Sequence, residues 1–158
     1  MKGYGCAMGL ASFEIAELYP LPAERVWAAA LSHEILKATM SPLFTYDGLP
    51  EGDAEEGQEI RLVVRLGPLA LARWRILFTR RDDEAFLLES EESGTLVKSW
   101  RHETRVEAQG PEAALYCDRL AIDAGLLTGF VGPWAVAMYT ERHTARRAAL
   151  GLSPGEAA

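Results

Sequence analysis

The sequence predicts an α+β fold in which an antiparallel sheet is covered by one long C-terminal helix. Apolar and polar residues alternate along several segments separated by Gly-Pro or charged turns, a pattern typical of antiparallel strands. Two short helical segments follow the first strand. From Leu126 to Leu150 apolar residues recur at helical spacing, and no other helical segment is long enough to cover the inner face of the sheet.

The totals fit one domain that spans residues 1–158. The chain has 158 residues, of which 49% are hydrophobic and 25% are charged, so it can bury roughly 70% of the surface that its unfolded state exposes. We expect an ordered core from about residue 11 to residue 150, with flexible ends at 1–10 and 151–158.

Charge and cysteine content exclude several classes of partner. The net charge of -7 argues against nucleic acid and anionic lipid surfaces, both of which attract Lys and Arg. Cys6 and Cys117 give neither metal-ligand spacing nor a disulfide framework, which favours reduced thiols in a cytoplasmic protein. No run approaches the length of a membrane span, and we expect no cofactor.

The first strand covers residues 12–18 and is followed by a helix that starts at Pro22, a residue tolerated in the first helical turn. Ser32 can cap a second short helix that ends at Ser41-Pro42. His33 lies beside this cap, and we expect it to be exposed at the helix end.

Strand patterns continue through the middle of the chain. Residues 43–46 can form a short strand, and the acidic loop 47–57 is either a solvated edge or a lid. Residues 59–66 form the next strand, and 73–80 with 85–91 form a hairpin. Outer-face charges and inner-face aromatics agree on one register for this hairpin, which pairs Arg73 with Glu91, Arg75 with Glu89, Arg80 with Glu84, Ile76 with Leu88 and Phe78 with Phe86.

The longest hairpin spans residues 96–123 and turns at Gly110-Pro111. A turn centred on Gly110 places Trp100 opposite Leu120 and His102 opposite Asp118, all on the inner face. The His102–Asp118 pair is the sharpest polar feature of the sequence.

Two roles for this pair stay open. His102 can act as a general base oriented by the Asp118 carboxylate, or the two can form a buried pair that serves structure or ligand positioning. No Ser or Cys nucleophile is spaced to form a triad with them. We predict no metal site. Such a site would need His33 or His143 as a further ligand beside the pair, and the sequence has no His-x-x-x-His or carboxylate-His pair at helical spacing that would indicate one.

The last helix is expected to begin loosely, because Gly129, Gly132 and Pro133 interrupt it, and to be firm from about Pro133. Trp134 and Met138 lie on its apolar side. Arg142 is expected in a surface ion pair with outer-face glutamates, and anchoring of an acidic or carbonyl-bearing ligand is the alternative.

A curved sheet that grips one helix leaves an interior gap, mostly apolar with a few polar groups, which is typical of a small-molecule pocket. The inward-facing aromatics can be either core or cavity wall. The predicted ligand-binding residues are Trp74, Ile76, Leu88, Trp100, His102, Thr104, Asp118, Leu120, Trp134 and Met138.

Several residues carry a family resemblance. The order of elements, the helix start Pro22–Trp27, the Trp100-x-His102 strand followed by Asp118-x-Leu120, and Tyr139-x-x-Arg142 resemble the SRPBCC superfamily. This is the helix-grip fold of START lipid-transfer domains, polyketide cyclases, coenzyme-Q-binding proteins and birch-pollen allergens. The resemblance covers about residues 11–150. It implies a cavity for a lipid, quinone or polyketide-like molecule and does not by itself imply catalysis.

Three functions follow from these observations. The first is binding or transport of a small hydrophobic ligand. The second is an enzyme of the cyclase, dehydratase or isomerase kind in which His102 and Asp118 form the acid/base pair. The third is a ligand-free interaction or regulatory module, with a homodimer as one form. An interior void lined by the predicted residues would favour the first two over the third.

Overall fold

The computed structural model describes residues 2–7, 10–40, 45–95 and 97–153. Eight strands form one antiparallel sheet in the order β1-β2-β8-β7-β6-β5-β4-β3. The bounds of the strands are β1 Lys2–Ala7, β2 Leu10–Tyr19, β3 Thr45–Asp47, β4 Glu59–Leu66, β5 Leu69–Asp82, β6 Leu87–Gly94, β7 Val97–Ala108 and β8 Ala114–Asp123.

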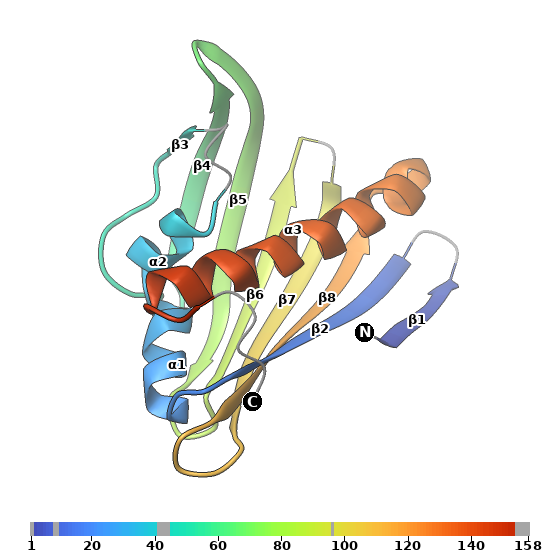
Figure 1. The fold of residues 1–158 in the computed structure, drawn as a ribbon. Helices are drawn as coiled ribbons and strands as arrows, with labels where there is room; N and C mark the ends of the chain where they lie inside the picture. Colours follow the sequence, from blue (N-terminus) through green and yellow to red (C-terminus); the bar gives the residue numbers. More distant parts are fainter. Residues whose placement is uncertain (1, 8–9, 41–44, 96, 154–158) are drawn as a thin grey trace.

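The helices are α1 (Ala23–Leu31), α2 (His33–Ala38) and α3 (Thr128–Ala149), with a single 3-10 turn, Gly125–Leu127, before α3. Figure 1 shows the sheet curving around α3, which crosses its inner face and ends beside α2. The predicted α+β helix-grip architecture is therefore confirmed.

Helices α1 and α2 follow from local sequence signals. Pro22 precedes α1 with φ of -54°, which suits the start of a helix. The Ser32 hydroxyl accepts a hydrogen bond from the Ile35 N–H at 3.3 Å and so caps α2 as predicted. The predicted stop at Ser41-Pro42 lies outside the described residues.

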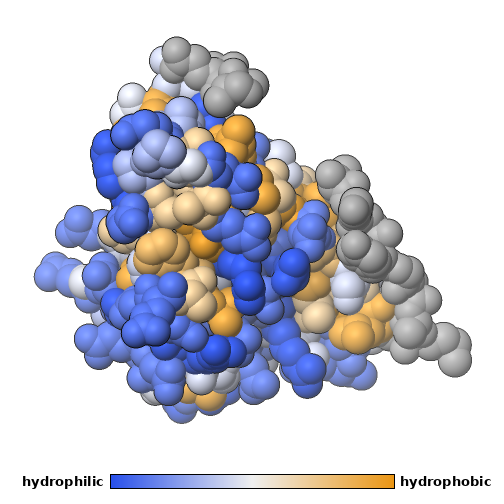
Figure 2. Space-filling view, turned by 90° about the horizontal axis from the view of Figure 1, so that it is seen from below, coloured by the Kyte–Doolittle hydropathy of each residue, from blue (hydrophilic) through white to orange (hydrophobic). Residues whose placement is uncertain are grey.

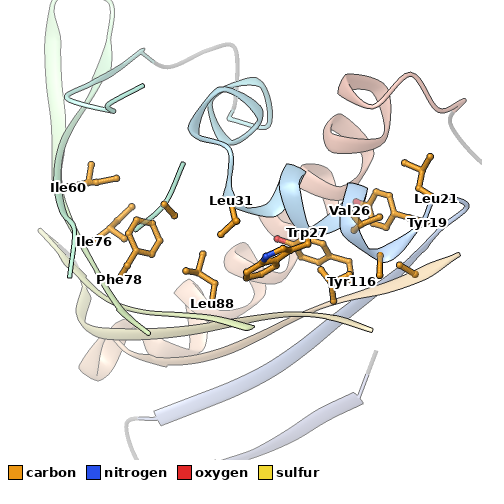
Figure 3. Packing of buried hydrophobic residues seen from close by; sticks show 14 of the residues in the cluster. Tyr19, Leu21, Val26, Trp27, Leu31, Ile60, Ile76, Phe78, Leu88 and Tyr116 are labelled. Carbon is orange, nitrogen blue, oxygen red and sulfur yellow. The ribbon is translucent and has the colours of Figure 1, made fainter. Parts of the chain in front are cut away.

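Two clusters of buried side chains form the core. The first joins α1 to the sheet, with Tyr19 and Leu21 at one end, Ile60 and Phe78 at the other, and Trp27 between them (Figure 3). The second lies beneath α3 and contains Trp100, Leu120, Ile122, Val131, Ala135 and Tyr139. Between these clusters the sheet and the helices are not in full contact, and the cavity described below occupies this space.

The predicted register of the central hairpin is wrong by two residues. Trp100 lies opposite Ile122, and Thr104 rather than His102 lies opposite Asp118. The reason is the turn, in which the Gln109 N–H donates to the Ala113 carbonyl at 2.8 Å, so that the turn centres on Pro111. A shift of two residues keeps every side chain on its face, and His102 and Asp118 still share the inner face.

The predicted register of the β5–β6 hairpin is wrong by four residues. Phe78 lies opposite Ser90, and Ile76 lies opposite Glu92. Phe86 is in the turn with φ of 48° and packs on Trp27 of α1, with ring centroids 5.8 Å apart. The charge argument failed because each strand has two neighbours, and Arg75 pairs with Glu59 of β4 at 2.7 Å instead of with β6.

The ends of several elements also differ from the prediction. Strand β1 pairs with β2 in the segment expected to be flexible, so the paired sheet begins before residue 11. Strand β3 begins at Thr45, and the predicted residues 43–44 lie outside the described residues. Helix α3 runs without a break from Thr128, whereas a loose beginning before Pro133 was predicted. The Thr128 hydroxyl accepts from the Ala124 N–H at 2.9 Å and orders the turn before the helix.

Hydrophilic side chains cover most of the face seen in Figure 2, with smaller hydrophobic areas between them. Among the described residues, no helix has the length and apolar character needed to cross a membrane.

Candidate functional site

A cavity of about 600 Å³ lies between the inner face of the sheet and the three helices. Most of its wall is aliphatic or aromatic, and the wall includes eight of the predicted residues, namely Trp74, Ile76, Leu88, Trp100, His102, Thr104, Trp134 and Met138. Size and composition are those of a small-molecule site.

Two predicted residues do not line the cavity. Leu120 is buried among the second core cluster beneath α3. Asp118 is 1% exposed and hydrogen-bonds to two wall residues, so it acts on the cavity only through them. Trp134 lines the cavity but is 53% exposed, which places it at the mouth.

Gly94 makes room for one aromatic wall residue. It lies opposite Trp74 on the neighbouring strand, and a Cβ atom at this position would overlap the indole ring. Trp74 also donates its Nε1–H to the Glu92 carboxylate at 2.6 Å and meets Trp100 edge-on, with ring centroids 5.5 Å apart. These contacts fix the orientation of both rings in the wall.

The polar part of the wall is built around His102. Its Nε2 atom lies 2.6 Å from Oδ1 of Asp118, and the Thr104 hydroxyl donates to the same oxygen at 3.1 Å. The predicted His102–Asp118 contact therefore exists, although it is diagonal across the β7–β8 pair rather than directly opposite.

A second histidine approaches Asp118 from α3. Nε2 of His143 lies 3.4 Å from Oδ2 of Asp118, a longer and weaker contact than that of His102. The other ring nitrogen of His143 faces the Tyr19 hydroxyl at 2.9 Å and Nη1 of Arg146 at 3.4 Å. Both imidazoles thus face one buried carboxylate with their Nε2 atoms.

The hydrogen-bond partners fix the tautomers. An ionised carboxylate only accepts, so Nε2 of His102 carries the hydrogen that it shares with Asp118. Arginine only donates, so Nδ1 of His143 is an acceptor and its hydrogen is on Nε2. In its neutral form His102 therefore has its lone pair on Nδ1, which can accept a hydrogen bond from the Tyr139 hydroxyl at 3.3 Å.

Asp118 stays ionised in this setting. Burial by itself raises the pKa of its carboxyl, but the hydrogen bond and charge of His102, together with the contact to His143, outweigh burial and hold the pKa below its usual value. Burial also raises the pKa of Tyr139 well above its usual value, so the hydroxyl that faces His102 keeps its proton.

The reaction that this arrangement can support is proton transfer by the His102 imidazole. His102 is held in one tautomer by Asp118, and its Nδ1 atom lies on the side of the Tyr139 hydroxyl and, at 3.8 Å, of the Glu92 carboxylate. Such an imidazole can accept a proton from a bound molecule or return one to it. Among the described residues no group of three or more His, Cys, Asp and Glu side chains is arranged to hold a metal ion.

A second depression, of about 670 Å³, lies over β2, β8, β7 and β6 and is lined largely by charged side chains. Arg119, half exposed there, is already paired with Glu14 at 2.8 Å and with Glu103 at 2.9 Å. Ion pairs in this setting remain hydrated and contribute little binding energy. We therefore assign the functional site to the cavity beneath α3.

No protein-family model matches the chain, and no curated protein matches it in sequence. Solved structures do match. The norcoclaurine synthase of Thalictrum flavum, in complex with dopamine and hydroxybenzaldehyde, superposes with a TM-score of 0.66 at 13% identity, covering 98% of this chain and 96% of that one. Ara h 8.0201 superposes with a TM-score of 0.64 at 12% identity, covering 89% and 99%. Protein CV1439 of Chromobacterium violaceum gives 0.68 at 12% identity, covering 87% and 94%.

These neighbours are Bet v 1-like proteins of the SRPBCC superfamily. The chain has the Bet v 1-like helix-grip fold. This fold is known for ligand binding, and the likeness at this level of identity is one of fold. The expected fold resemblance is thereby confirmed.

Two expectations about the polar residues of this helix-grip fold are wrong. His33 is not exposed: it is 1% exposed and lines the cavity, because α2 packs it against Phe78. Within the described ranges Arg142 makes no surface ion pair. It also lines the cavity, and its guanidinium lies 4.8 Å from the centre of the Tyr139 ring, an attractive cation–π contact.

Sequence reasoning missed several further residues. Buried Arg146 lies over the Tyr116 ring at 4.2 Å, and buried Arg147 donates to the Leu18 carbonyl at 2.9 Å. The available signal was the three- and four-residue spacing of Tyr139, Arg142, His143 and Arg146, which puts them on adjacent positions of one helix face.

Proposed function

We propose that this protein binds a small, mainly apolar molecule in the cavity between the sheet and α3. The observation that supports this most directly is the cavity of about 600 Å³ with a largely apolar wall and a polar cluster on one side. A filled interior would have favoured the ligand-free interaction module. Candidate ligands are lipid, quinone or polyketide-like molecules, and the fold of the norcoclaurine synthase, solved with dopamine and hydroxybenzaldehyde, also makes aromatic ligands worth testing.

A cavity-filling substitution with a matched control tests this proposal. Ala72 of β5 lines the cavity, whereas its neighbour Arg73 is exposed. Ala72→Trp is expected to weaken binding of an environment-sensitive apolar dye at least about tenfold, because the indole occupies ligand space. Arg73→Trp adds the same indole outside and should leave the affinity within about twofold.

Native mass spectrometry of the purified wild-type chain provides a second measurement, since it detects a retained ligand and also reports whether the protein is a homodimer. Non-saturable dye binding, or equal effects of the two tryptophan substitutions, would contradict the proposed cavity. The free, buried thiol of Cys117 agrees with the predicted cytoplasmic location.

A second candidate function is general acid/base catalysis by His102, with Asp118 as its positioning residue. The hydrogen bond of 2.6 Å between them fixes the tautomer and puts the basic lone pair on Nδ1, where a bound substrate would replace the Tyr139 hydroxyl. A suitable probe is the elimination of 5-nitrobenzisoxazole, in which a base removes the ring C–H proton as the N–O bond breaks to give a cyanophenolate.

His102→Gln is expected to lower the elimination rate of the bound probe about 100-fold, within the range that a positioned base contributes. Binding of the probe, measured by competition with the apolar dye, should change much less. An unchanged rate in His102→Gln would show that the cavity binds without base catalysis.

A further inference from the structure

His33 is a buried imidazole for which the protein supplies no hydrogen bond. The side chain is 1% exposed, and neither ring nitrogen has a partner among the described residues. A neutral imidazole has one N–H donor and one lone-pair acceptor. Because buried polar groups are nearly always paired, an imidazole with both nitrogens unpaired requires an explanation.

The His33 ring lines the cavity rather than a solid part of the core. The Phe78 ring centre lies 6.2 Å from that of His33, and the cavity wall also includes the apolar residues Leu36, Ala54 and Leu62. None of these side chains can donate or accept a hydrogen bond. Since neither ring nitrogen has a partner among the described residues, a molecule bound in the cavity is the candidate partner for His33.

The backbone around His33 holds the ring in place. The His33 N–H donates to the Gly52 carbonyl at 2.9 Å, and the Ala54 N–H donates to the Leu31 carbonyl at 2.9 Å. Together with the bridge between Ser32 and Asp53, these bonds attach the start of α2 to the loop before β4. The backbone of His33 is thus fixed at the cavity wall. A ligand reaches the ring nitrogens only after a small shift of the surrounding side chains, because both nitrogens are covered in this structure.

His33 is distant from the polar cluster around His102. Phe78, which contacts His33, lies opposite Ser90, and Ser90 lies opposite His102 on the next strand. Two strand spacings separate Phe78 from His102 by roughly 10 Å. His33 is therefore a polar group of the wall separate from the cluster around His102.

We infer that His33 binds a hydroxyl group of an apolar ligand, as a second polar subsite of the cavity. This rests on the proposed binding function and names its ligand class: a molecule with an apolar body and at least one alcohol or phenol. A hydroxyl can donate to the ring nitrogen that carries the lone pair or accept from the ring N–H, so it can pair with either unpaired nitrogen. A carboxylate would bring a negative charge into apolar surroundings that contain no cation beside His33.

Fluorescence titration with 1-hydroxypyrene and pyrene tests this inference, because the two probes differ by one hydroxyl. The wild-type protein is expected to bind 1-hydroxypyrene about tenfold more tightly than pyrene. His33→Leu should bind both equally, and His33→Gln, which keeps a donor and an acceptor, should recover part of the preference. Lys37→Leu, an exposed position on the same helix, should retain the wild-type preference.

The outcomes separate the two proposals. Saturable binding of pyrene without a preference for 1-hydroxypyrene, or a preference that survives in His33→Leu, would overturn the role of His33 and leave the binding function standing. No saturable binding of either probe would overturn both.

If His33→Leu fails to fold, nitrogen-15 NMR spectra of the histidine rings in the wild-type protein test the hydrogen bond between His33 and the ligand hydroxyl. In the wild-type protein a His33 ring signal that moves with 1-hydroxypyrene and not with pyrene supports the hydrogen bond, and identical spectra with the two probes refute it.

Discussion

Replacing Asp118 with alanine is expected to lower the free energy of unfolding by about 3–5 kcal/mol, the range for removing one member of a buried charged group. The carboxylate accepts from His102 at 2.6 Å and from Thr104 at 3.1 Å, and His143 lies 3.4 Å away. Alanine would leave these donors buried without an acceptor. Urea denaturation at pH 7, followed by tryptophan fluorescence and circular dichroism, measures the loss.

The effect of this substitution should depend on pH in one direction. The folded protein holds the pKa of Asp118 below its unfolded value of roughly 3.9. Its contribution is therefore fully present above about pH 4 and is lost as pH falls toward the folded pKa. The difference between wild type and Asp118→Ala should therefore shrink as the pH falls below about 4.

Asp47→Ala is the matched control for this experiment. Asp47 is also a strand carboxylate with a partner, Arg65 at 2.7 Å, but its side chain is 58% exposed. An exposed pair of this kind contributes at most about 1 kcal/mol. Equal losses in the two variants would contradict the role assigned to Asp118.

Trp100→Ala is expected to cost about 3–5 kcal/mol, as truncation of a fully buried aromatic residue does. The indole is 1% exposed and lies between Trp74, edge-on at 5.5 Å, and Tyr139, stacked at 6.2 Å between ring centroids. Truncation would open a void that joins the existing cavity and would remove the support of both neighbours. Urea denaturation again gives the free energy.

Trp134→Ala removes the same side chain from a position that is 53% exposed at the mouth of the cavity. Its cost should stay below about 1 kcal/mol, because exposed substitutions seldom exceed that. A Trp134→Ala variant less stable than Trp100→Ala would show that α3 packs on the sheet differently from this structure.

The candidate site could be predicted only in part. Alternation along residues 96–106 and 114–123 predicted one shared face for Trp100, His102, Thr104 and Asp118. That prediction is correct although the predicted register is wrong, because a shift of two residues leaves each side chain on its face. His33, His143 and Arg142 were missed or misplaced. Their positions depend on how α2 and α3 pack on the sheet, and no local pattern records that contact.

The sequence by itself determined the elements, their order and the inward face of each strand, since propensity and periodicity are local properties. The extent of one domain over residues 1–158 stays a prediction of that kind. Only the tertiary structure decided which groups meet. It turned the pair formed by His102 and Asp118 into a carboxylate shared with His143, and it enclosed His33 in the cavity without a partner. The physical reason is that hydrogen bonding and desolvation depend on distances of a few ångströms between segments far apart in the chain.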